Sequence, residues 1–176
     1  MKKRYFIMIC LCLLTWSGAW AQRPEVAPNV FIYVEGNQYP MKSITSQTEK
    51  KKGWDIQGIS VGGKFQRYFW GKKSKQLTDS QPKFAIFPKE YNLNDYAIIR
   101  LNERKSYRRL PDAELKECDY VRIDLNAFVI ENLPDMGFSV TPKTPLFPGE
   151  YILINLEQKP VNEEGDVIAY DFTVPE

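Results

Sequence analysis

Hydrophobic and polar positions form their clearest pattern near the C-terminus. Residues 151–156 are apolar, aromatic and β-branched, which is the composition of a buried strand. Residues 167–174 alternate between apolar and polar side chains, which indicates a strand with two different faces. The polar residues 157–166 between them contain Pro160 and Gly165, both of which interrupt strands. This part of the chain therefore predicts a β-hairpin with a long loop.

Similar short patterns occur along the rest of the chain, separated by turn residues. Strands are predicted in residues 30–34, 39–44, 54–61, 64–70, 83–87, 96–102, 120–130 and 138–141. Gly62 and Gly63 predict a hairpin between the two strands that flank them, and Pro148-Gly149 predicts a type II turn. The polar residues 45–53 are interpreted as an exposed loop.

No long segment has the apolar period of a helix, and only residues 111–117 suit a single helical turn. No repeat of solenoid or propeller length is present. Roughly eight to ten short strands in one domain predict an all-β fold, a single-domain antiparallel β-sandwich over residues 30–176. A β-barrel is the alternative. Residues 22–29 contain two prolines and are interpreted as a flexible lead-in.

The N-terminus has the three parts of a secretory signal peptide. Residues 2–4 are basic, residues 6–14 form an apolar run too short to span a bilayer, and residues 19–21 read Ala-Trp-Ala, a typical cleavage site. We predict cleavage before Gln22 and export to the periplasm or the cell exterior. No membrane insertion is expected after the leader, residues 1–21, is removed.

Loss of the leader changes both the charge and the cysteine content. The whole chain has 24 basic and 22 acidic residues, and the leader holds three of the basic ones, so 21 basic and 22 acidic residues remain. A nearly neutral protein argues against nucleic acid as a partner. Cys10 and Cys12 also leave with the leader, so Cys118 has no partner for an intramolecular disulfide. Both leader cysteines lie inside the apolar run, which argues against a lipid anchor.

The C-terminal half contains the segments IENLPDMGFSVTPKTPL, PGEY and YDFTV in that order. In this order it resembles uncharacterised exported bacterial proteins of a kind frequent in Bacteroidetes. The residues that carry the resemblance are Pro145, Pro148, Gly149, Glu150, Tyr151, Asp171 and Phe172. The resemblance implies an all-β exported domain, and it implies no activity.

The chain contains no histidine. This excludes Ser-His-Asp and Cys-His catalysis and the usual catalytic zinc sites. Cys118 lies between two carboxylates, which disfavour a reactive thiolate, so it is interpreted as an ordinary thiol. A carbohydrate-active hydrolase with paired carboxylates remains an alternative, for which Asp119, Asp124 and Glu131 are the candidates.

Two segments contain the oxygen-bearing residues that calcium prefers, namely residues 92–95 and residues 162–166. Neither segment matches a full calcium-binding loop, and asparagine, glycine and aspartate are also the common residues of turns. No metal and no cofactor is predicted.

Two stretches combine basic and aromatic side chains. In residues 64–70 the alternation puts Tyr68 and Trp70 on one strand face. If that face is exposed, they form a platform for a sugar ring or a protein partner, and the alternative is that both faces are buried. Arg104, Arg108 and Arg109 suit an anionic group, or else protect a sheet edge.

From these patterns we expect an exported, non-enzymatic module that binds a protein or a glycan. Two alternatives remain open besides it: the hydrolase, and an envelope protein that assembles with itself. Nothing in the sequence sets the oligomeric state.

Overall fold

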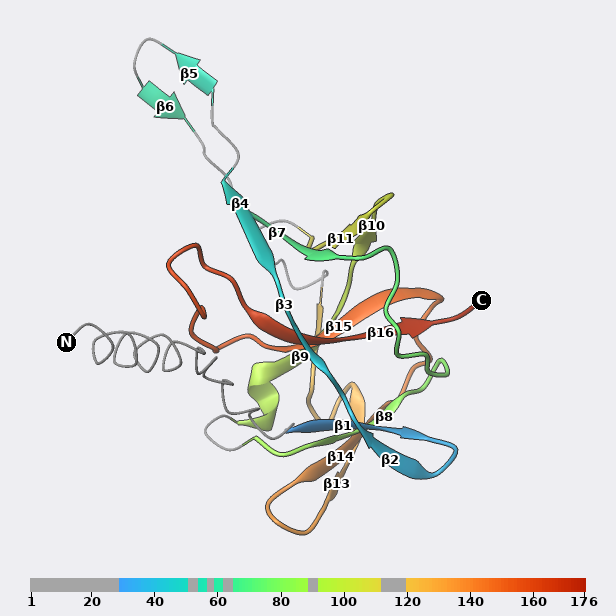
Figure 1. Ribbon diagram of the computed structural model, residues 1–176. Helices are drawn as coiled ribbons and strands as arrows, with labels where there is room; N and C mark the ends of the chain where they lie inside the picture. The colour runs from blue at the N-terminus through green and yellow to red at the C-terminus, as the bar shows by residue number, and fades with distance from the viewer. Residues whose placement is uncertain (1–28, 51–53, 57–58, 62–64, 89–91, 112–119) are drawn as a thin grey trace, which may run out of the picture.

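The computed structural model describes residues 29–50, 54–56, 59–61, 65–88, 92–111 and 120–176 (Figure 1). These residues are nearly all in strands and turns, with one 3-10 helix, η2 (Leu93–Asp95). The strands are β1 (Val30–Val34), β2 (Asn37–Pro40), β3 (Ser43–Thr45), β4 (Gln47–Lys50), β5 (Trp54–Ile56), β6 (Ile59–Val61), β7 (Phe65–Trp70), β8 (Lys83–Ile86), β9 (Tyr96–Arg100), β10 (Asn102–Glu103), β11 (Tyr107–Arg109), β12 (Tyr120–Arg122), β13 (Phe128–Asn132), β14 (Phe138–Pro142), β15 (Gly149–Asn155) and β16 (Ile168–Val174).

The strands form three larger antiparallel sheets. Sheet A has the order β13-β14-β8-β1-β2, sheet B has the order β12-β9-β15-β16-β3, and sheet C has the order β10-β11-β7-β4. A separate hairpin of β5 and β6 projects from the body beyond β4 and β7 (Figure 1). Each of the three sheets has two open edges in the described residues, so the β-sandwich prediction is confirmed rather than the barrel.

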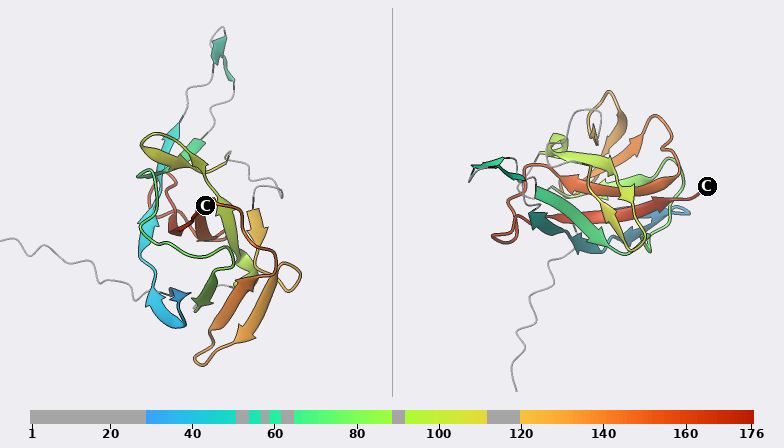
Figure 2. Two further views of the ribbon diagram at one scale, coloured as in Figure 1. Left: turned by 90° about the vertical axis from the view of Figure 1, so that its right-hand side faces the viewer. Right: turned by 90° about the horizontal axis from the view of Figure 1, so that it is seen from above.

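Sheet B is covered on both faces, because its strands alternate between two hydrophobic clusters. Ile98 and Leu153 belong to the larger cluster, shared with Phe84 and other residues of sheet A. Ile99 and Ile152 belong to the smaller cluster, which sheet C covers from the other side. Figure 2 accordingly shows the red C-terminal strands in the middle of the molecule. Continuous burial on both faces explains why β9 and β15 are apolar along most of their length.

The C-terminal hairpin is confirmed, with β15 and β16 paired from Gly149 opposite Val174. The type II turn at Pro148-Gly149 is wrong. Gly149 already belongs to β15, and its φ of +154° is far from the value near +80° that a type II turn needs. A Cβ atom at Gly149 would lie 2.9 Å from Nε of Arg100, so the close approach of this side chain explains the glycine.

The predicted hairpin between residues 54–61 and 64–70 is wrong. Strand β7 pairs with β4 on one side and with β11 on the other, whereas β5 pairs with β6. The prediction of an exposed loop over residues 45–53 is also wrong, because strand β4 lies in this segment. Its side chains are polar because it is the edge strand of sheet C, where backbone pairing does not require apolar side chains. Gly62 and Gly63 lie outside the described residues.

The single strand predicted over residues 120–130 is also wrong. Strand β12 belongs to sheet B and β13 to sheet A, and a turn separates them. The carboxylate of Asp124 makes this turn, because its Oδ1 accepts hydrogen bonds from the backbone N–H groups of Asn126 and Ala127 at 2.8 and 2.9 Å. Alternation continues across the turn in the sequence, but the two halves belong to different sheets.

Several predicted features lie outside the described residues. These are the signal peptide, the lead-in up to residue 28, residues 112–117 of the predicted helical turn, Cys118 and Asp119. Within the described part of the chain, no helix is long and apolar enough to cross a membrane.

The start of β1 is fixed to β16 through Tyr170, whose hydroxyl donates to the side-chain oxygen of Asn29. Burial of the Tyr170 phenol, reinforced by Tyr96, raises its pKa to about 12, and a hydrogen bond with the backbone of Asn29 opposes the rise. The usual tyrosine pKa is about 10, so the folded state holds this proton more tightly than the unfolded state.

We therefore expect the stabilisation from Tyr170 to be complete below pH ~10 and to be lost as the pH rises towards ~12. Urea unfolding of the wild type and of Tyr170→Phe across this range checks the expectation. The phenylalanine variant should lose less of its unfolding free energy than the wild type does. Parallel losses in the two proteins would contradict the assignment.

Candidate functional site

The outward side of sheet C carries a cluster of aromatic and polar side chains, which we call the aromatic face. It consists of Tyr68 and Trp70 of β7, Tyr107 and Arg109 of β11, and Gln47 of β4. The strand register explains the cluster, because Tyr107 pairs with Trp70, and Tyr68 pairs with both Arg109 and Gln47. Residues directly opposite each other in neighbouring strands project from the same side of a sheet.

The three rings of the aromatic face contact one another. Tyr68 and Trp70 have ring centroids 5.6 Å apart, and Tyr68 and Tyr107 have centroids 5.5 Å apart. The indole N–H of Trp70 donates to the side-chain oxygen of Gln47 at 2.7 Å, which fixes the orientation of the ring. Trp70 is nevertheless 59% exposed, whereas its neighbour Phe69 is buried in the smaller core cluster.

The two faces of β7 thus differ in burial, as its sequence predicts. Phe69 points inward, Trp70 is exposed and Tyr68 is half-buried. The alternative, in which both faces are buried, is wrong for Trp70. Tyr107 is a member that the sequence analysis did not assign, since its position opposite Trp70 depends on the pairing of β11 with β7.

The three candidate arginines do not act together. Arg104 is exposed at the turn between β10 and β11, and Arg109 lies on the aromatic face. Arg108 points the other way and is only 2% exposed. The prediction that Arg108 binds an external anion is therefore wrong, because the alternation of β11 turns its side chain into the protein.

Arg108 is held by two carboxylates of sheet B. Its Nη1 lies 3.2 Å from Oε2 of Glu150 and 2.7 Å from Oδ2 of Asp171. Its Nε and Nη2 donate to the backbone oxygens of Gly71 and Trp70. The arginine therefore joins sheet C to sheet B directly beneath the aromatic face.

Glu150 completes this buried network. Its Oε2 also accepts the backbone N–H of Ser74 at 2.8 Å, and its Oε1 accepts the hydroxyl of Thr173 at 2.6 Å. The sequence contained one signal for this site, since Asp171 and Thr173 are the polar positions of an otherwise apolar strand. Their alternation with apolar residues places Asp171 and Thr173 on the second face of β16, and the structure shows that sheet C covers this face.

The candidate carboxylates for hydrolysis have other contacts. Asp124 makes the turn before β13, and Glu131 forms an exposed ion pair with Lys83 at 3.1 Å. The structure does bring together Glu150 and Asp171. Both of these bind Arg108, however, and Glu150 is only 1% exposed, so the pair is not open to a substrate.

The two oxygen-rich segments form turns. Both carboxylate oxygens of Asp166 accept hydrogen bonds, from Thr48 at 2.8 Å and from Asn162 at 2.7 Å. Asp95 accepts the backbone N–H of Asn92 at the start of η2. In the part of the chain that the structure describes, no three carboxylate or cysteine side chains are grouped as a metal site requires.

The comparison of the chain with protein-family models, with curated proteins and with solved structures finds no match. The resemblance of the C-terminal half to exported bacterial proteins stays a prediction.

Proposed function

We propose that the protein is an exported, non-enzymatic binding module that holds a protein partner on its aromatic face. The observation that carries the proposal is that Trp70 is exposed although its contacts with Tyr68, Tyr107 and Gln47 hold its ring in one orientation. Exposure of a large apolar ring to water is unfavourable, and tryptophan, tyrosine and arginine are the residues most enriched among those that contribute most to binding at protein interfaces.

The ring geometry favours a protein partner over a glycan. A glycan chain that stacks on several rings needs them nearly coplanar, so that successive sugar faces meet successive ring faces. Trp70 lies at 89° to Tyr68 and at 81° to Tyr107. Such edge-to-face packing makes a rigid apolar cluster on the surface, and a cluster of this kind can pack among the side chains of another protein.

The charges beside the rings indicate a partner that carries carboxylates. Arg109 lies on the face itself, and its buried Nε has no hydrogen-bond partner in the described residues. Arg104 and Lys105 are exposed at the adjacent turn, where Glu103 lies beside them, and Glu49 is exposed on the same side of β4 as Gln47. A carboxylate of the partner would form charge-assisted hydrogen bonds with the exposed guanidinium groups beside the rings.

The test is affinity capture from an envelope extract of the native host, followed by measurement with the purified partner. We expect Trp70→Ala to weaken binding about 30-fold or more, because loss of a central aromatic residue costs about 2 kcal/mol or more. Leu77→Ala is the matched control, since Leu77 has the same 59% exposure but lies in a segment next to β16. The control should bind like the wild type.

Two results would overturn the proposal. One is capture of the same proteins, with equal affinity, by the wild type and by Trp70→Ala. The other is binding to a glycan array that disappears in Trp70→Ala, which would make a sugar the ligand of this face.

A further inference from the structure

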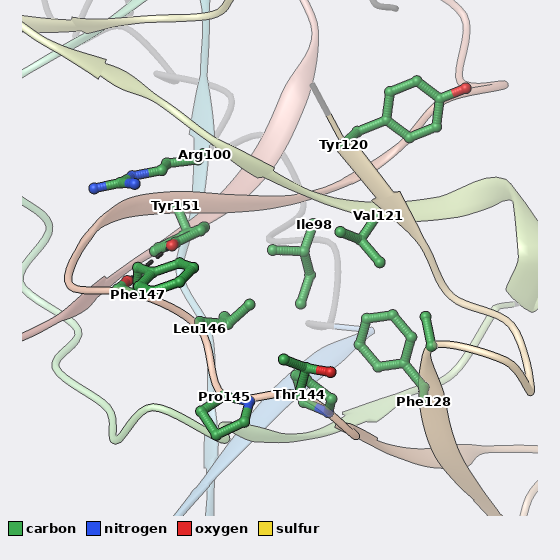
Figure 3. Close-up of a pocket in the computed structure, with 12 residues that line it drawn as sticks. Ile98, Arg100, Tyr120, Val121, Phe128, Thr144, Pro145, Leu146, Phe147 and Tyr151 are labelled. Atoms are coloured by element: carbon green, nitrogen blue, oxygen red, sulfur yellow. Dashed lines mark hydrogen bonds between the residues drawn. The ribbon is translucent and has the colours of Figure 1, made fainter. Parts of the chain in front are cut away.

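A pocket opens on the other side of sheet B from the aromatic face (Figure 3). Its inner wall is made by Ile98, Phe128 and Tyr151, which belong to the larger core cluster. The loop between β14 and β15 forms the outer wall through Leu146 and Phe147. The pocket is thus a place where the core between sheets A and B remains open to solvent.

The size and lining of the pocket suit a small apolar ligand. Its volume is about 460 Å³, within the range of roughly 300–1,000 Å³ typical of small-molecule sites. Phe147 is 75% exposed, and Val121 on the edge strand β12 is also exposed. Apolar side chains left exposed around an apolar pocket are a common feature of ligand sites.

Among the described residues that line this pocket, Arg100 is the one with a charged side chain. It lies opposite Tyr151 in the register of β9 and β15, so both side chains are on the pocket side of sheet B. Its Nη2 donates to the backbone oxygen of Pro148 at 2.7 Å, and it forms no ion pair with a described carboxylate. Since a guanidinium has five N–H donors, most of its donors remain for a ligand.

We propose that this pocket binds an amphipathic carboxylate, specifically a free fatty acid, with its hydrocarbon chain on Ile98 and Phe128 and its carboxylate on Arg100. The apolar wall contributes the affinity by burying the chain. The arginine selects the sign of the head group, because it is the only charged side chain among the described residues that line the pocket. This site and the aromatic face lie on opposite sides of sheet B and share no residue, so the inference goes beyond the proposed function.

Calorimetric titration of the purified protein with decanoate tests the proposal, with decyltrimethylammonium as a probe of equal chain length and opposite charge. We expect decanoate to bind and the cation to bind at least ten-fold more weakly. Arg100→Met, which keeps the apolar stem, should weaken decanoate binding about ten-fold, whereas Arg100→Lys should retain most of it. Val121→Trp should weaken it by filling the mouth of the pocket.

The controls separate this site from the aromatic face. Trp70→Ala should bind decanoate like the wild type, and Arg100→Met should bind the protein partner like the wild type. Circular dichroism spectra and unfolding midpoints show whether each variant is folded. If Arg100→Met does not fold, the comparison of decanoate with the cation on the wild type decides the proposal.

Four results would overturn the proposal. They are equal affinities for the two amphiphiles, no binding of decanoate, binding to phosphatidylglycerol vesicles without binding of the free acid, and a dimer that Val121→Trp dissociates. The third would make a lipid surface the source of the chain. The fourth would make a second copy of the protein the occupant.

Discussion

Replacement of Arg108 by methionine is expected to destabilise the protein by about 3–5 kcal/mol. The substitution keeps an apolar side chain in the space, but it leaves the carboxylates of Glu150 and Asp171 without the cation that both contact. Glu150 is almost completely buried, so its charge cannot be compensated by water. The backbone oxygens of Gly71 and Trp70 also lose their donors. Urea unfolding measures the effect.

Arg104→Met is the matched control for this prediction. Arg104 lies in the same hairpin and undergoes the same chemical change, but it is exposed, so we expect an effect within about 0.5 kcal/mol. Equal stabilities of the two variants would show that the buried ion pairs do not hold sheet C on sheet B. Because Arg108 binds the backbone of Trp70, the variant should also bind the protein partner more weakly at temperatures where it remains folded.

Phe172→Ala is expected to cost a similar amount, about 3–5 kcal/mol. The ring of Phe172 is fully buried in the larger core cluster, where it stacks on Tyr151 at 5.5 Å between centroids and contacts Phe84 of sheet A at 5.2 Å. Removal of the ring leaves a cavity between the two sheets that their strands cannot close by local movement. Thermal unfolding should show a fall of several degrees in the midpoint.

Phe147→Ala provides the comparison, since it removes the same ring from a position that is mostly exposed. We expect it to change the unfolding free energy by about 0.5 kcal/mol or less. A large effect of Phe147→Ala would mean that this residue closes the core, and the pocket beside it would then be part of the folded interior. A small effect of Phe172→Ala would contradict the packing of sheet A on sheet B.

The local pattern determined the fold class and many of the strands. Phe172, for example, lies between the polar residues Asp171 and Thr173, and alternation fixes which side chains share a face whatever the partner strand is. The C-terminal hairpin follows for the same reason, because its two strands are close in sequence. The sequence also predicts that Phe69 and Trp70 point to opposite faces, because they are adjacent residues of one strand.

The tertiary structure alone decided which strands pair and which polar residues are buried. Strand β7 pairs with β4 and β11 rather than with its neighbour, and this long-range pairing places Tyr107 beside Trp70. The same pairing turns Arg108 towards Asp171, which is 63 residues away in the chain. Alternation shows that Arg108 and Arg109 point in opposite directions, but not which direction is inward. That choice depends on which face another sheet covers, because a buried charge is stable only where its partners lie within hydrogen-bonding distance.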